Sequence, residues 1–106
     1  MKRGEVRWYK FNQPDKKRPV LVLTRDSIIE YLGDITIAPV TTRIRDIPSE
    51  VVLTPEEGMP QRCAVNCDHL QTVQKSRMGT VVTSLTRSKM QEVSQALAFA
   101  LDLDEC

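Results

Sequence analysis

The stretch Arg18-Pro19-Val20-Leu21-Val22-Leu23-Thr24 decides how the chain folds. Its four consecutive apolar residues, two of them β-branched, predict a strand, because the run is too short for a helix. Pro19 fixes its own φ and favours an extended backbone at Arg18. We therefore expect a guanidinium to be held where the basic segment Asp15-Lys16-Lys17 becomes a rigid strand.

A second stretch, Ile35-Thr36-Ile37-Ala38-Pro39-Val40-Thr41-Thr42, ends in two hydroxyl side chains. We interpret residues 34–40 as a strand, in which Pro39 predicts an edge or bulged position because proline cannot donate to the ladder. A polar, basic loop follows, with Arg43 and Arg45. The functional interpretation depends on whether the ends of these two strands meet.

The rest of the chain predicts further strands and one clear helix. Thr86 is a candidate N-cap, after which Met90, Val93 and Leu97 recur at helical spacing, with Gln91, Glu92 and Gln95 outward. A short helical turn over 27–32, capped by Thr24 or Asp26 and ended by Gly33, precedes the second strand. The other expected strands are 5–11, 50–53, a kinked pair at 63–67 and 69–73, and 79–82. Antiparallel strands closed by a C-terminal helix predict a small β-barrel-like α+β domain.

The length and the charge distribution of the chain restrict the number of domains and the class of partner. A chain of 106 residues with no repeat or linker predicts a single domain over residues 1–106. Residues 1–25 hold eight Lys or Arg and two acidic residues (8 − 2 = +6), whereas the rest holds seven basic and twelve acidic residues (7 − 12 = −5). This split favours a cationic face for a polyanion or an acidic peptide, with an ordinary solvated surface as the alternative.

Cysteine and histidine usage gives no metal pattern. The spacing of Cys63 and Cys67 is not that of a zinc knuckle, and His69 is the only histidine. We expect reduced thiols, Cys106 included, and neither metal nor cofactor. The N-terminus is charged, and the longest apolar run, 96–101, is too short to span a membrane. These features favour a soluble, cytoplasmic protein with no membrane partner.

Few residues offer catalytic chemistry. The sequence has no Gly-rich phosphate loop and no Ser-His-Asp set that spacing supports. What remains is Arg18 near the hydroxyls that end the second strand. An arginine with hydroxyls is a poor nucleophile system but a good clamp for a phosphate or an oxyanion. The alternative is that Arg18, like most exposed arginines, only solvates the surface.

Several segments together resemble the MazF/PemK/Kid family of toxin–antitoxin endoribonucleases. The resemblance runs in order through nearly the whole chain and includes the closing amphipathic helix. The segments that show it are Lys2-Arg3-Gly4-Glu5-Val6, Arg18-Pro19-Val20-Leu21-Val22, Ile37-Ala38-Pro39-Val40-Thr41-Thr42, Ile47-Pro48-Ser49-Glu50-Val51 and Asp68-His69-Leu70-Gln71-Thr72-Val73.

The resemblance implies a homodimer of SH3-like barrels, of the CcdB/MazF type, that cuts single-stranded RNA, usually mRNA, at a short sequence without metal. In such enzymes the ribose 2′-hydroxyl attacks the adjacent phosphate and leaves a 2′,3′-cyclic phosphate and a 5′-hydroxyl. The family's catalytic arginine falls on Arg18 and its threonine on Thr41, or on Thr42 if the register slips by one. An antitoxin with an acidic, flexible tail is the expected partner.

The same resemblance suggests which residues bind RNA, and it leaves alternatives open. Lys16, Lys17, Thr42, Arg43 and Gln71 are the candidates, although the basic ones fit a plain solvated loop as well. Trp8 and Phe11 are expected either to stack bases or to pack inside, and His69 to have a structural or interface role rather than a chemical one. The loop before Arg18 is short and lacks the glycine that is usual in the family. Alternative functions are a CcdB-like gyrase poison and a non-catalytic SH3-like RNA-binding module.

Overall fold

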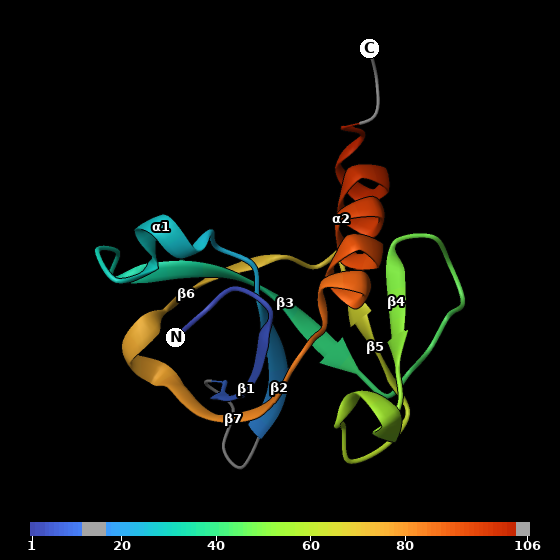
Figure 1. Cartoon of the computed structure of the whole chain (residues 1–106), viewed down its shortest axis with the longest axis horizontal. Helices are drawn as coiled ribbons and strands as arrows, with labels where there is room; N and C mark the ends of the chain where they lie inside the picture. Colours follow the sequence, from blue (N-terminus) through green and yellow to red (C-terminus); the bar gives the residue numbers. More distant parts are fainter. Residues whose placement is uncertain (12–16, 104–106) are drawn as a thin grey trace.

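The computed structural model describes residues 1–11 and 17–103. Within these residues, seven strands form one curled antiparallel sheet in the order β4-β5-β3-β2-β1-β7, and β6 also pairs with β3 (Figure 1). This architecture confirms the predicted α+β barrel with a C-terminal helix. The elements are β1 (Glu5–Lys10), β2 (Lys17–Val22), α1 (Asp26–Ile29), β3 (Asp34–Thr41), β4 (Glu50–Leu53), η1 (Pro55–Glu57), β5 (Cys63–Asn66), β6 (Gln71–Gln74), η2 (Lys75–Arg77), β7 (Met78–Ser84) and α2 (Arg87–Leu101).

The inner part of strand β2, residues 20–22, is a continuous apolar run because both of its faces are buried. Successive side chains of a strand point to opposite faces. Val20 and Val22 pack into a cluster with residues of β1, β3, β6 and α1, whereas Leu21 and Leu23 pack into a second cluster under α2. A strand that is buried on both faces has apolar residues at successive positions, whereas a strand with one solvent-exposed face alternates apolar and polar residues. This stretch therefore connects the two cores.

Helix α2 closes the second cluster and agrees with its prediction. The Thr86 side chain caps it by accepting from the Lys89 N–H at 3.1 Å. Val93 and Ala96 are buried against the sheet, and Met90 and Leu97 pack beside them. Neither α2 nor any other helix of the described residues is long and apolar enough to cross a membrane.

The predicted side-chain cap of the short helical turn is wrong. Arg25 is the N-cap residue of α1 and makes no side-chain cap hydrogen bond. Thr24 Oγ1 instead accepts from the Thr36 N–H at 2.8 Å, and the Asp26 carboxylate accepts from the Arg3 N–H at 2.7 Å. Both side chains therefore join α1 to distant parts of the fold. The helix itself ends at Ile29, four residues before Gly33.

The edge position predicted from Pro39 is also wrong, because β3 is paired on both sides. One side pairs with β2, and the other pairs first with β6 and then with β5. Pro39 lies between the segment that pairs with β6 (34–37) and the segment that pairs with β5 (40–41), so the missing donor falls at a change of partner. Strands β5 and β6 lie end to end along β3, which fits the predicted strand with a kink.

Candidate nucleic-acid interface

The site lies where β2 and β3 separate. Their ladder ends at the pair Val20–Pro39, and Pro19 follows on the outer side of that pair. Prolines have no N–H to extend the ladder. The register, continued by two residues, places Arg18 opposite Thr41, but β3 has by then turned to pair with β5 through Val40 and Thr41. The diverging strands leave an opening between these two side chains.

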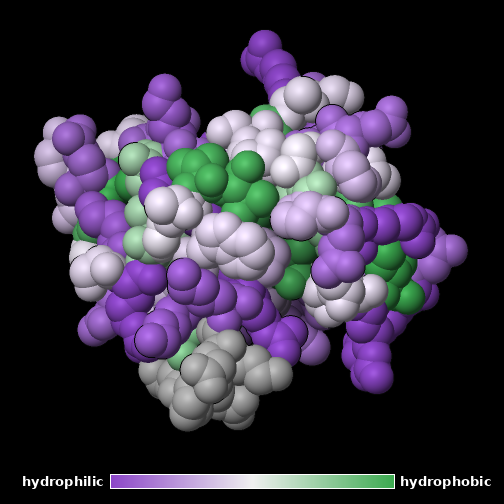
Figure 2. All heavy atoms as spheres, turned by 90° about the horizontal axis from the view of Figure 1, so that it is seen from below, coloured by the Kyte–Doolittle hydropathy of each residue, from purple (hydrophilic) through white to green (hydrophobic). Residues whose placement is uncertain are grey.

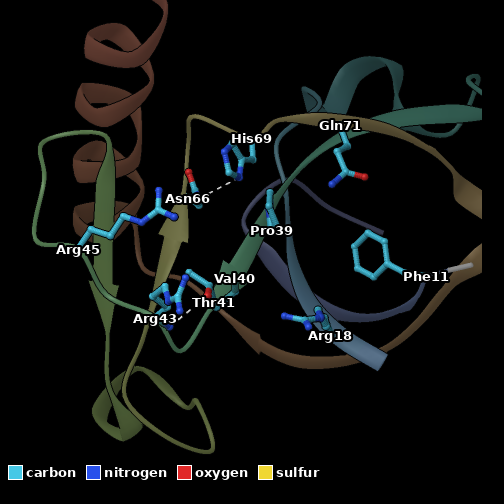
Figure 3. A pocket seen from close by; sticks show the side chains of 10 residues that line it. All are labelled: Phe11, Arg18, Pro39, Val40, Thr41, Arg43, Arg45, Asn66, His69 and Gln71. Atoms are coloured by element: carbon cyan, nitrogen blue, oxygen red, sulfur yellow. Dashed lines mark hydrogen bonds between the residues drawn. The ribbon is translucent and has the colours of Figure 1, made fainter. Parts of the chain in front are cut away.

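This opening is a hollow of about 590 Å³, which we call the first hollow. Arg18 lines it from β2 and Thr41 from β3, with side chains of the β3–β4 loop and of the β5–β6 turn around them (Figure 3). Three of its ten lining residues are arginines and none is acidic, so the described wall of the hollow favours an anion. The lining residues are Phe11, Arg18, Pro39, Val40, Thr41, Arg43, Arg45, Asn66, His69 and Gln71.

Arg18 presents an exposed guanidinium at the first hollow. Its side chain is exposed, and its guanidinium makes no hydrogen bond or ion pair with any other described residue. Arg7, on the neighbouring strand, shows the contrast: it bonds Glu5 at 2.8 Å and the Gly79 carbonyl at 2.8 Å. A guanidinium whose donors no described residue uses suits bidentate contact with a phosphate.

The hydroxyl of Thr41 is oriented by the loop that follows it. Thr41 Oγ1 accepts a hydrogen bond from the Arg43 N–H at 3.1 Å, which is a local side-chain turn. Since one lone pair of the oxygen is used, the O–H remains as a donor to a ligand. The same bond holds Arg43 beside Thr41 in the first hollow.

Asn66 is a site residue that the sequence analysis missed. It is buried, its Oδ1 accepts from the Asp68 N–H at 2.9 Å, and its Nδ2 lies 3.3 Å from His69 Nδ1 (Figure 3). Because Oδ1 is already occupied, Nδ2 faces the ring and Nδ1 accepts, which leaves Nε2–H as the donor of His69. The signal in the sequence was the Asn66-Cys67-Asp68 turn, in which an asparagine bonds the backbone two residues on.

Phe11 is packed on the core and also lines the first hollow. Its ring packs edge-to-face on Tyr9, with ring centroids 4.7 Å apart, and it also lines the first hollow. Tyr9 is buried in the core, so Phe11 stands on a rigid support.

A second hollow of about 390 Å³ adjoins the first and shares Arg18, Val40 and Thr41 with it. Lys17 and Thr42 line the second hollow, together with Trp8 and the half-buried Pro19. The candidates named from the sequence are thus divided: Arg43 and Gln71 lie at the first hollow, Lys17 and Thr42 at the second, and Arg18 and Thr41 at both. Lys16 lies outside the described residues.

The two cysteines that the sequence analysis considered for a metal or redox role lie among buried residues. Cys63 and Cys67 are buried free thiols. Burial, and then the charge of Asp68, raise the pKa of Cys67 to about 11, so this thiol is not a nucleophile at neutral pH.

The curled sheet and the closing helix define a small α+β protein of the SH3-like barrel type, with a hollow whose described lining includes three arginines. Residues 2–101 match the family of PemK-like, MazF-like toxins of type II toxin–antitoxin systems, and the chain belongs to this family. It is 37% identical over 92 residues to Endoribonuclease MazF3 of Mycobacterium tuberculosis, covering 87% of this chain and 89% of that protein. It is 39% identical over 101 residues to Probable endoribonuclease MazF5 of the same species, covering 94% and 92%.

Solved structures agree with this assignment. The Mycobacterium tuberculosis toxin MazF-mt6 is similar with a TM-score of 0.84 and 32% identity, over 92% of this chain and 96% of that chain. An endoribonuclease in complex with its cognate antitoxin, from a mycobacterial species, is similar with a TM-score of 0.87 and 26% identity, over 97% and 96%. The family and fold that the sequence motifs implied are therefore confirmed.

Proposed function

We propose that this toxin is a metal-independent, sequence-specific endoribonuclease that cuts single-stranded RNA, mRNA in particular. The observation that supports the proposal is one arrangement: Arg18, with no partner among the described residues, and the Thr41 hydroxyl line the same hollow, whose described wall has no carboxylate. Its family and its relatives named endoribonucleases supply the reaction class.

In the proposed reaction the nucleophile belongs to the substrate. The ribose 2′-oxygen loses its proton and attacks the adjacent phosphorus, and the bond from phosphorus to the 5′-oxygen breaks as that oxygen takes up a proton. The products are a 2′,3′-cyclic phosphate and a 5′-hydroxyl. The protein must then align the attack and stabilise the charge on the crowded phosphorane.

Arg18 and Thr41 divide this work. Arg18 stabilises the phosphorane oxygens electrostatically, because a guanidinium keeps its protons in proteins and is a poor acid. Thr41 donates its hydroxyl hydrogen to a non-bridging oxygen, in the orientation that its bond from the Arg43 N–H leaves open. Neither residue has to change its protonation state.

The neighbouring residues hold the RNA. Lys16, Lys17 and Arg43 contact phosphates, which gives affinity without base preference. Thr42 and Gln71 hydrogen-bond to bases or riboses beside the scissile phosphate. These contacts, and not Arg18 or Thr41, select the sequence that is cut.

The proposed partners are a second copy of the chain and an antitoxin. A family relative is known in complex with its cognate antitoxin. An acidic, flexible antitoxin tail would be attracted to the two hollows, since none of their described lining residues is acidic, and it would compete with RNA for Arg18. With mRNA as the proposed substrate, the proposed location of the enzyme is the cytoplasm.

Cleavage of a mixed RNA pool by the purified chain, in the presence of a chelator, tests this function. We expect cuts at one short sequence, with 5′-hydroxyl ends that can be mapped by ligation and sequencing, and no effect of the chelator. Ends that carry 5′-phosphates, or loss of activity on chelation, would contradict the chemistry. Salt-sensitive binding with no products would indicate an RNA-binding module, and inhibited DNA supercoiling with intact RNA a gyrase poison.

A further inference from the structure

A third hollow of about 290 Å³ continues the series on the outer side of β1 and β2. It shares Trp8 and Lys17 with the second hollow, which in turn shares Arg18 and Thr41 with the first. Figure 2 shows hydrophilic side chains gathered on the face of the molecule below the ends of β1, β2 and β7. A single-stranded RNA that lies across Arg18 and continues past Trp8 would therefore reach the third hollow.

Repulsion between like charges at the third hollow destabilises the sheet when no ligand is bound. Lys10 and Lys17 are direct partners in the β1–β2 ladder, and like charges in opposite positions destabilise a sheet. Arg77 Nη2 donates to the Lys10 carbonyl at 3.1 Å, and its guanidinium lies over the Tyr9 ring, 5.7 Å from the centroid. None of the described lining residues is acidic. A phosphate bound between the two lysines would offset their repulsion.

Trp8 forms the wall between the second and third hollows. It stands on the same face of β1 as Lys10, opposite Pro19 and Lys17 of β2. It is half-buried, so its indole is held and still reachable. On the far side Gly79 lets β7 come close, since a Cβ on this glycine would lie 3.0 Å from the Trp8 carbonyl oxygen. A fixed indole beside two lysines is what a stacked base with its phosphate requires.

We propose that Trp8, Lys10 and Lys17 form a second RNA subsite, which holds a nucleotide next to the cleaved position. The base stacks on Trp8, and the phosphate lies between Lys10 and Lys17. The proposal rests on the proposed function for its ligand, single-stranded RNA, and extends the contact surface beyond Arg18. It follows that affinity rises with RNA length until the strand reaches the third hollow.

The chain contains a single tryptophan, so the fluorescence of Trp8 reports this subsite directly. The test titrates the purified chain with 2′-O-methyl oligoribonucleotides, which lack the attacking hydroxyl, at lengths of about three and about nine nucleotides. We expect saturable quenching with the longer strand and much weaker quenching with the shorter one. Lys10→Gln should weaken binding of the longer strand about three- to tenfold and lower the salt slope by about 0.7.

Lys2→Gln is the matched control, because it makes the same change of charge at a residue that lines none of the three hollows. Equal losses in both variants, or binding of a labelled strand with unchanged Trp8 emission, would overturn the subsite. Quenching by an acidic peptide but not by RNA would also overturn it in favour of a protein partner. Length-dependent quenching in a chain that cleaves no natural RNA would support the subsite and refute only the nuclease.

Discussion

The open end of β2 and β3 and the region where α2 covers β4 and β5 use their side chains in opposite ways. Under α2, Leu53 and Val93 are fully buried, and the helix begins at a satisfied cap. At the open end the ladder stops at prolines, and Arg18 has no partner among the described residues. The difference shows that packing under α2 contributes to stability, whereas the open end keeps charge and donors that no described residue uses. Substitutions should therefore separate folding from function.

The largest expected effect is on stability, from Leu53→Ala. Leu53 is 0% exposed, so removing its side chain should leave a cavity and lower the free energy of unfolding by about 3 kcal/mol. Urea denaturation measures this loss, and Leu103→Ala, at a side chain that is 64% exposed, is the control. Cleavage per folded molecule should stay the same. A selective loss of cleavage would show that the two regions are coupled.

Arg18→Ala should produce the largest loss of activity. Removing the proposed phosphorane contact is expected to lower the rate of RNA cleavage at least about a hundredfold, or about 2.7 kcal/mol, with the melting temperature unchanged. The control is Arg25→Ala, at an exposed arginine outside the three hollows. If the purified Arg18→Ala protein cleaves as well as the wild type, the proposed site is refuted.

Thr41→Val should have a smaller effect, because it removes one neutral hydroxyl and keeps the shape. We expect cleavage to fall about tenfold and to recover largely in Thr41→Ser. Thr42→Val, compared in the same single-turnover assay, decides the register between the two threonines. A larger loss in Thr42→Val would move the catalytic hydroxyl to Thr42.

Thr86→Ala is a milder change in the region where α2 covers β4 and β5. Loss of the N-cap bond to the Lys89 N–H should lower the free energy of unfolding by about 1 kcal/mol. Ser88→Ala, in the same exposed first turn but without the cap role, is the comparison. Both variants should cleave RNA normally, and a defect in either would argue against the separation of the two regions.

The smallest effect concerns pH. The Thr54 N–H and side chain bond the Glu57 carboxylate and hold the pKa of Glu57 below its ordinary value. A depressed folded pKa gives stability that is present above the unfolded pKa and is lost as the pH falls through the folded one. We therefore expect the wild type to melt at a higher temperature than Glu57→Gln at about pH 7, and the difference to shrink as the pH falls through the folded pKa of Glu57. A difference that does not change with pH would show that the charge of Glu57 does not contribute to stability through its hydrogen bonds with Thr54.

Local patterns predicted much of the fold and of the site. The apolar run of β2 and the spacing in α2 are short-range signals, and the order of the motifs placed Arg18 and Thr41 at neighbouring strand ends. What could not be predicted depends on pairing between distant segments. Asp26 bonds a backbone group 23 residues away, and Pro39 lies where β3 changes partner. The Lys10–Lys17 pair likewise exists only through the β1–β2 register.

The two prolines at the open end have one more consequence. Many peptide ligands bind by adding a strand to an exposed sheet edge, which requires a row of free backbone donors. Pro19 and Pro39 each lack a backbone N–H, so both strands offer fewer donors at the opening and β-augmentation is disfavoured there. An inhibitor that occupies this gap must therefore be recognised by its side chains, and the chain is protected from pairing with other copies of itself through the same opening.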